Sequence, residues 1–194
     1  MSPVLIYVLG PSGAGKDSVL EWLKAHLPPD AGVHFARRCI TRAAHPGAEQ
    51  HEPMNRETFA DARDAGSFGL CWSANGLDYG VRHAELQGPP GTGWVFVTGS
   101  RAYLPQAIAL FPGLVVLHVT ASPEVLLERL VARGRESASD IRARLERAPP
   151  LERPSGTTVL EIHNNARLQD AGHQLELALG FLPGWSARAQ KSLR

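Results

Sequence analysis

Three stretches of continuous, β-favouring apolar residues lie along the chain, at Val4–Leu9, Trp94–Thr98 and Leu114–Thr120. A strand with one face in water would alternate apolar and polar residues, and these stretches do not, so they predict strands buried on both faces. A further strand is expected over Thr158–Ile162. Strands covered on both faces are typical of a parallel sheet with helices on each side.

Helical patterns separate these strands. Lys16–His26 carries apolar residues at helical spacing and stops before Pro28-Pro29, and Ser122–Glu124 reads Ser-Pro-Glu, a helix start. A last helix is expected over about Leu168–Leu179. Strands alternating with helices predict a three-layer α/β fold with a mostly parallel sheet and right-handed crossovers.

The region between the first two of these strands has a different pattern. Thr41–Met54 is polar and rich in Gly, Pro and His, which predicts a long loop. Asn55 is placed to cap a helix through Ala65. Two short strands, Ser67–Ala74 and Leu77–Val81, are expected to pair across the Asn75-Gly76 turn. Together these elements predict a small αβ insert.

A glycine-rich loop, Gly10-Pro-Ser-Gly-Ala-Gly-Lys16, joins the first strand to the first helix and matches the pattern G-x-x-x-x-G-K. Its glycines let backbone N–H groups curl around phosphate oxygens at a helix N-terminus, and Lys16 would neutralise the β- and γ-phosphates of ATP. An ordinary glycine-rich turn is the alternative, but the strand before it and the helix after it favour a P-loop NTPase fold. The expected ATP-binding residues are Gly10, Pro11, Ser12, Gly13, Ala14, Gly15, Lys16, Asp17 and Ser18.

The residue after Lys16 departs from the usual pattern, which has a Ser or Thr hydroxyl on Mg²⁺ at this position. Here Asp17 follows, with Ser18 behind it. A carboxylate is a competent hard ligand for Mg²⁺, so Asp17 and Ser18 are the expected metal ligands. The alternative is that Asp17 only stabilises the start of the helix.

Six arginines lie within a short segment after the third apolar strand: Arg129, Arg133, Arg135, Arg142, Arg144 and Arg147. Arg133 and Arg135 flank Gly134 at a helix break, which indicates a mobile lid whose guanidinium groups stabilise the transferring phosphoryl group. With Lys16 they are the expected catalytic residues. A solvated helical face is the alternative explanation for Arg129, Arg142 and Arg147.

A second basic cluster begins at Arg37-Arg38 and continues through the long loop. Arg, Thr and Tyr side chains can hold a second phosphate, while Glu49 and His51 can bind sugar hydroxyls. Tyr79 is otherwise a core aromatic residue and His51 a surface loop residue. The expected acceptor-binding residues are Arg38, Thr41, Arg42, Glu49, His51, Tyr79, Arg101 and Arg144.

Bulk properties narrow the class of partner. The 194 residues fit one domain, and a net charge of +1 gives no general reason to expect a nucleic acid or a membrane as partner. The two cysteines have no metal-ligand spacing, and the N-terminus lacks the features of a signal peptide, so a cytoplasmic protein is expected. The sequence does not indicate an oligomeric state.

The expected boundaries within the domain are a core over about 1–36, 92–132 and 157–182, an insert over about 37–86 and a lid over about 133–150.

Read together, these motifs make the chain resemble the guanylate-kinase-like branch of nucleoside-monophosphate kinases. Within it, the chain is most similar to the ribose 1,5-bisphosphate phosphokinase family. The motifs that carry this likeness are Gly15-Lys-Asp-Ser18, Ile40-Thr-Arg42, Glu49-x-His51, Gly76-Leu-x-Tyr-Gly80, Gly99-Ser-Arg101 and Arg133-Gly-Arg-Glu136. The resemblance implies ATP- and Mg²⁺-dependent phosphorylation of ribose 1,5-bisphosphate to 5-phosphoribosyl 1-diphosphate, in phosphonate breakdown.

Two departures distinguish the chain from guanylate kinases. Those enzymes carry a guanine-reading glutamate where Leu70 falls here, and His45 replaces the second arginine of their phosphate clamp. A leucine cannot accept the hydrogen bonds that guanine offers. The alternatives that remain are guanylate kinase or another nucleoside-monophosphate kinase, a non-catalytic guanylate-kinase-like interaction module, and a kinase acting on a sugar hydroxyl.

Overall fold

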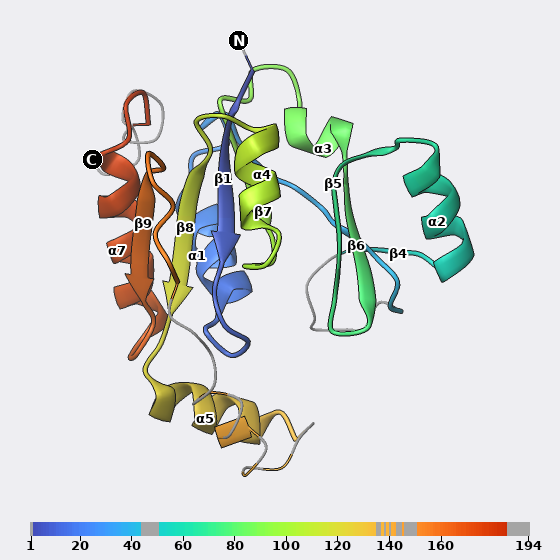
Figure 1. Cartoon of the computed structure of the whole chain (residues 1–194). Helices are drawn as coiled ribbons and strands as arrows, with labels where there is room; N and C mark the ends of the chain where they lie inside the picture. Colours follow the sequence, from blue (N-terminus) through green and yellow to red (C-terminus); the bar gives the residue numbers. More distant parts are fainter. Residues whose placement is uncertain are drawn as a thin grey trace. The chain divides into compact units, whose positions relative to one another are not determined.

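The computed structural model describes residues 2–43, 51–134, 137, 139, 141, 142, 145 and 151–185. Its strands are β1 (Val4–Leu9), β2 (Val33–Phe35), β3 (Cys39–Ile40), β4 (Glu52–Pro53), β5 (Phe68–Ala74), β6 (Leu77–Arg82), β7 (Trp94–Thr98), β8 (Val115–Thr120) and β9 (Val159–His163). Its helices are α1 (Lys16–His26), α2 (Arg56–Asp64), α3 (His83–Gln87), α4 (Leu104–Leu110), α5 (Pro123–Ala132) and α7 (Leu168–Gly180), and Figure 1 labels these elements.

A five-stranded sheet with the order β2-β7-β1-β8-β9 is the centre of the fold. The β2–β7 and β8–β9 pairs are parallel. Every residue of β7 is buried, as are five of the six residues of β1 and of β8. The continuous apolar stretches were therefore correctly interpreted as buried strands, and the α/β fold with a mostly parallel sheet is confirmed.

The chain divides into two compact units. The first comprises Met1–Tyr7 and Gly32–Val115, and the second comprises Val8–Ala31 and Val116–Arg194. The first unit contains the whole of the expected insert, and the second contains the glycine-rich loop and the segment expected to form a lid. The finer division into core, insert and lid stays a prediction.

The first unit carries a second sheet, with the order β4-β3-β6-β5. Its β5–β6 hairpin turns at Asn75 and Gly76, which have φ of 52° and 74°, the left-handed pair that a two-residue hairpin turn requires. Asn55 caps α2, because its Oδ1 accepts the Thr58 N–H at 2.7 Å. α2 packs beside β5 and β6 (Figure 1), so the helix and the hairpin that were predicted for this region are present.

Five short elements were not predicted: the strands β2, β3 and β4 and the helices α3 and α4. β4 interrupts the expected loop, since Glu52–Pro53 pairs in parallel with β3. A two-residue strand has no sequence pattern of its own and forms only because β3 offers an open edge. The short helices α3 and α4 lack a full amphipathic repeat, and α4 buries only Leu104 and Ala107.

In the second unit, α1 packs against α7. The Trp22 ring lies directly over Gly172, where any Cβ would overlap it. α5 begins as expected, with Ser122 Oγ accepting the Val125 N–H at 3.5 Å and Pro123 in the first turn. Among the described residues, no helix has the length and apolar character needed to span a membrane.

Candidate active site

The glycine-rich loop of the second unit links β1 to α1, and its last glycine opens the helix. Gly15 is the N-cap residue of α1 and has a φ of 82°, a left-handed conformation that a Cβ would strain. Lys16 Nζ donates to the carbonyl oxygens of Gly10 at 3.0 Å and Pro11 at 3.2 Å. The loop therefore curls around its own lysine, which holds a positive charge beside the backbone N–H groups at the start of α1.

Two residues that the sequence did not link to this loop brace it by donating hydrogen bonds to its carbonyl oxygens. The Asn164 side chain is 4% exposed, and its Nδ2 donates to the Ala14 carbonyl oxygen at 2.9 Å. Arg129 Nη1 donates to the Gly13 carbonyl oxygen at 3.4 Å. Because these bonds use the carbonyl side of the loop, they leave its N–H side for an anion. One signal was available, since Asn164 directly follows the C-terminal end of β9, the edge where parallel sheets bind ligands.

We expect Asn164→Ala to weaken ATP binding. The substitution removes the donor to the Ala14 carbonyl oxygen, in a residue that is fully buried, so the loop loses a fixed hydrogen bond. The KM for ATP should rise about tenfold, and the free energy of unfolding should fall by about 1–3 kcal/mol. Steady-state kinetics with each substrate varied in turn measures the first effect, and denaturant titration measures the second.

Asn165→Ala is the matched control. The neighbouring Asn165 Oδ1 accepts the Ser122 N–H at 2.7 Å and has no bond to the loop. Its loss should leave the KM for ATP within about twofold of the unsubstituted value, because surface contacts of this kind contribute little. Equal changes in the two variants would contradict the bracing role of Asn164.

The expected metal ligands lie in the first turn of α1. Asp17 and Ser18 are both exposed, and their carboxylate and hydroxyl oxygens are the hard donors that Mg²⁺ prefers. Over the residues described, no group of three or more His, Cys, Asp or Glu side chains forms a dedicated metal cage. A site of one carboxylate completed by substrate phosphates fits this donor set, as Mg²⁺ is usually held.

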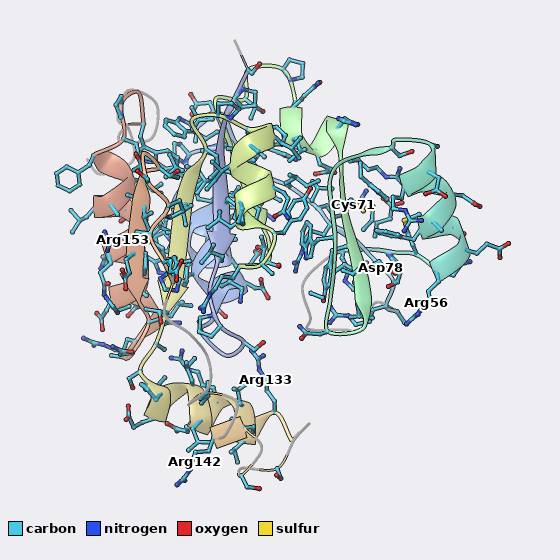
Figure 2. The ribbon with its side chains drawn as sticks, viewed as in Figure 1. Arg56, Cys71, Asp78, Arg133, Arg142 and Arg153 are labelled. Atoms are coloured by element: carbon cyan, nitrogen blue, oxygen red, sulfur yellow. The ribbon has the colours of Figure 1, made fainter. Side chains whose placement is uncertain are left out.

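Of the arginines expected to act in catalysis, Arg133 is described and exposed. It is the C-cap residue of α5, and Gly134 beyond it has a φ of 64°. Figure 2 shows Arg133 at the end of α5 and Arg142 on the segment beyond. α5 is joined to the glycine-rich loop through Arg129, so the expected lid begins on a helix that touches the loop. Arg135 and Arg144 lie outside the described residues, as does Glu49.

In the first unit, two of the expected acceptor-binding residues, Arg38 and Arg42, lie on either side of β3. Arg38 is 9% exposed, and its guanidinium carbon lies 5.3 Å from the centroid of the Tyr79 ring. Ile40 pairs with Tyr79 across the β3–β6 ladder, so their side chains share one face of the four-stranded sheet. Arg38 lies on that same face, because its guanidinium is over the Tyr79 ring, and Arg42 follows Ile40 by two residues, beyond the end of β3. We call this face, with Arg42 at its end, the arginine face.

Arg42 has a feature that indicates a ligand. Its Nε atom is buried, and among the described residues no group accepts a hydrogen bond from it. A buried guanidinium nitrogen without an acceptor is costly, and a phosphate oxygen would satisfy it. His51 supports this residue from the backbone, because its Nε2 lies 3.0 Å from the Arg42 carbonyl oxygen.

Two expected acceptor residues therefore have structural contacts. His51 is 7% exposed, so the alternative of a surface loop residue was wrong. Thr41 Oγ1 accepts the Asp78 N–H at 2.8 Å, and the Thr41 N–H donates to the Asp78 carbonyl oxygen at 3.1 Å. These bonds fix the end of β3 against β6 and thereby orient Arg42.

Two further aromatic residues of the first unit are Tyr103, which lies beyond β7, and Tyr7 of β1. Tyr103 stacks on Trp72 of β5, with ring centroids 5.5 Å apart. The Tyr7 hydroxyl donates to the Ser100 carbonyl oxygen at 2.9 Å, and burial raises the pKa of this phenol, which keeps it a neutral donor. Arg101, also expected to bind the acceptor, follows Ser100 and is half-buried.

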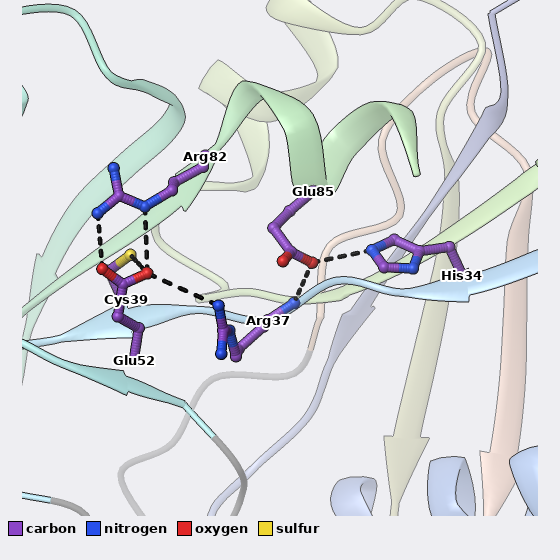
Figure 3. Close-up of polar contacts among 6 residues, drawn as sticks. All are labelled: His34, Arg37, Cys39, Glu52, Arg82 and Glu85. Carbon is purple, nitrogen blue, oxygen red and sulfur yellow. Dashed lines mark hydrogen bonds and ion pairs between the residues drawn. The ribbon is translucent and has the colours of Figure 1, made fainter. Parts of the chain in front are cut away.

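The other face of the four-stranded sheet holds an ion-pair cluster (Figure 3). Arg82 donates to both oxygens of Glu52, at 2.6 and 3.1 Å, and this hydrogen bonding lowers the pKa of the Glu52 carboxyl. Burial raises the pKa of the Cys39 thiol to about 11, helped by the nearby Glu52. Cys39 is thus protonated near neutral pH and is not a nucleophile.

A second carboxylate, that of Glu85, connects the segment before the four-stranded sheet to the helix that follows it. Glu85 Oε2 lies 2.8 Å from His34 Nε2 and accepts the Arg37 N–H at 2.8 Å (Figure 3). α3, which carries Glu85, is thereby tied to the segment between β2 and β3. The bond from Arg37 fixes the backbone directly before Arg38.

Comparison with known proteins identifies the family. The chain is 44% identical over 172 residues to the ribose 1,5-bisphosphate phosphokinase PhnN of Burkholderia pseudomallei, covering 88% of this chain and 92% of that protein. It is 48% identical over 173 residues to the protein of the same name from Chromobacterium violaceum, covering 88% and 90%. The chain belongs to the ribose 1,5-bisphosphate phosphokinase family.

Membership of this kinase family is consistent with the fold. The guanylate kinase of Anaplasma phagocytophilum superposes with a TM-score of 0.63 at 16% identity, over 98% of this chain and 90% of that protein, so the two share a fold. No protein-family model matches the chain. As members of a kinase family, such chains use ATP as co-substrate and act on a small phosphorylated molecule.

Leu70, which falls where a guanine-reading glutamate is expected in guanylate kinases, lies on the arginine face. Leu70 pairs with Val81 across β5 and β6, and it is 1% exposed. A buried leucine presents neither donors nor acceptors to a ligand. The roles of the individual site residues remain predictions.

Proposed function

We propose that this protein transfers the γ-phosphoryl group of ATP to ribose 1,5-bisphosphate, forming 5-phosphoribosyl 1-diphosphate and ADP. The observation that carries the proposal is sequence identity of 44% across 88% of the chain with a relative named for that activity. The braced glycine-rich loop with Lys16 and the arginine face with Arg38 and Arg42 supply the two kinds of site that the reaction requires.

The chemistry needs little beyond positioning and charge. An oxygen of the acceptor's 1-phosphate attacks the γ-phosphorus in line, and the bond from that phosphorus to the bridging oxygen of ADP breaks. The acceptor phosphate is already anionic near neutral pH, because its second pKa is about 6, so no strong general base is needed. Lys16 and Arg133 would stabilise the charge on the transferring group.

Magnesium is the metal that fits this site. Asp17 and Ser18 would hold Mg²⁺ at the start of α1, where the ion would offset the charge of the β- and γ-phosphates. The remaining ligands of the Mg²⁺ ion would be oxygen atoms of the ATP phosphates.

The second candidate function is a nucleoside-monophosphate kinase, favoured by the fold shared with guanylate kinase. Leu70 opposes it, since a guanine edge would meet a buried apolar side chain. A non-catalytic module would require loss of the loop, yet its glycines and Lys16 are all present.

A coupled ADP-release assay tests the proposal. The protein is given ATP and Mg²⁺ with ribose 1,5-bisphosphate, GMP, dGMP, UMP or gluconate at matched concentrations. Preferred turnover of ribose 1,5-bisphosphate is expected. Preference for GMP would overturn the sugar-bisphosphate assignment in favour of the second candidate, and absence of turnover with every acceptor would favour a binding module.

A further inference from the structure

Aromatic side chains form a continuous stack that begins beside Arg38, one of the expected acceptor-binding residues of the first unit. Tyr79 and Trp72 are cross-strand partners whose rings are 5.4 Å apart and 4° from parallel. Trp72 also stacks on Tyr103, with ring planes 28° apart. We call Tyr79, Trp72 and Tyr103 the aromatic ladder, and Arg38 rests on the Tyr79 end of it.

Two hydrogen bonds hold Tyr103 at its end of the ladder. Tyr103 precedes α4, where its N–H lies 3.2 Å from Ser100 Oγ, and its hydroxyl accepts the Cys71 N–H of β5 at 3.5 Å. The Trp72 ring is thus fixed by stacking and by a partner that bonds to its own strand. Only 8% of Trp72 is exposed, so its stacking surface is already used within the protein.

The residues around Trp72 on the arginine face are apolar and closed to solvent. Leu70, Val81 and Ile40 are each exposed by 1% or less. A nucleobase bound here would need an aromatic or apolar slot for its face and hydrogen-bond partners for its edge. Among the described residues, the Trp72 ring already stacks on Tyr79 and Tyr103, and Leu70, Val81 and Ile40 offer no hydrogen-bond partner for a base edge. Phosphate and sugar hydroxyl groups, in contrast, need only the arginines and other polar groups.

We propose that Trp72 is the specificity-determining residue that restricts the acceptor to phosphorylated sugars without a base. The indole stacks on Tyr79, the ring over which the Arg38 guanidinium lies, so it fills the volume on the arginine face just beyond that ring. Its apolar neighbours Leu70, Val81 and Ile40 would offer the base of a nucleoside monophosphate no hydrogen bond. This inference rests on the proposed function, because it concerns the acceptor of the same site. It differs from the effect of Leu70, since it concerns volume and stacking, not the reading of a guanine edge.

Trp72→Leu tests the inference, with Trp94→Leu as the matched control. Trp94 is of the same residue type, is 7% exposed and lies in the same unit, but it belongs to β7 in the other sheet. Two quantities are measured for each variant: the ratio of kcat/KM for ribose 1,5-bisphosphate to that for GMP, and the Kd for GMP by calorimetry. The KM for ATP and the circular dichroism spectrum report whether each variant is folded.

We expect Trp72→Leu to lower the selectivity ratio at least about tenfold and to tighten GMP binding by a similar factor, the range that a change in pocket volume supports. Trp94→Leu should leave both quantities unchanged. Trp72→Phe, which keeps a ring in the ladder, should give an intermediate result and replaces Trp72→Leu if that variant does not fold. Selectivity and GMP affinity unchanged in the Trp72 variants would overturn the inference.

Failure of the proposed function is a separate outcome. It would appear in the unsubstituted protein as preferred turnover of GMP, before any variant is made. If the unsubstituted protein prefers ribose 1,5-bisphosphate and the Trp72 variants keep the same selectivity ratio, only the specificity role of Trp72 is contradicted, and the proposed function stands.

Discussion

Lys16→Ala is expected to lower kcat/KM by a factor of about 10²–10³, the effect of removing one preorganised donor from a transferring charge. Lys16 Nζ is held by the carbonyl oxygens of Gly10 and Pro11, so its ammonium has a fixed place in the loop. No other lysine is near in sequence to replace it, since the next is Lys24. The ADP-release assay at saturating acceptor measures the loss.

Lys24→Ala is the control on the same helix. The Lys24 side chain is 56% exposed and makes only a 3.9 Å contact with Glu21, so its removal should leave turnover unchanged. Both variants should retain the helical circular dichroism of the unsubstituted protein. Full turnover by Lys16→Ala would refute the role of the loop in phosphoryl transfer and, with it, the proposed function.

Gly10→Ala should have the second large effect, on both stability and ATP binding. A Cβ at this position would overlap the backbone carbonyl oxygen of Val119 in β8, and backbone cannot move aside as a flexible side chain can. Such overpacking costs about 1–3 kcal/mol or more. Displacement of the loop would also disturb the carbonyl oxygen that holds Lys16. We expect a lower free energy of unfolding and a KM for ATP raised by about tenfold.

Gly156→Ala separates the overlap from the general cost of replacing glycine. Gly156 has a φ of 71°, and a Cβ there would meet no atom within 4 Å. The only cost of Gly156→Ala is therefore the backbone strain of a non-glycine residue at positive φ, which is about 1 kcal/mol. If denaturant titration gave the same loss for Gly10→Ala and Gly156→Ala, with the KM for ATP unchanged in both, the clash with Val119 would not be the cause.

The candidate site could be predicted only in part from the sequence. The glycine-rich loop was recognised because all of its residues are adjacent in the chain, between a buried strand and a helix. Asn164 was missed because its partner, Ala14, is 150 residues away. His51 was assigned to the acceptor site, but the sequence could not show that it is buried against the Arg42 backbone.

The aromatic ladder shows the same limit. Trp72 lies within β5, a strand that the sequence predicted, and it is buried. Its stacking on Tyr103 depends on where the segment after β7 meets β5, which no local pattern encodes.

By itself, the sequence determined the elements whose patterns are long and local: the buried strands β1, β7 and β8, the helix α1 with its preceding loop, and the hairpin at Asn75 and Gly76. These follow from side-chain periodicity and from backbone preferences of neighbouring residues. The tertiary structure alone decided which buried polar groups are paired and which are left without a partner, such as the Arg42 Nε among the described residues. Hydrogen bonds and ring stacks between distant segments depend on packing, and packing is fixed only when the whole chain has folded.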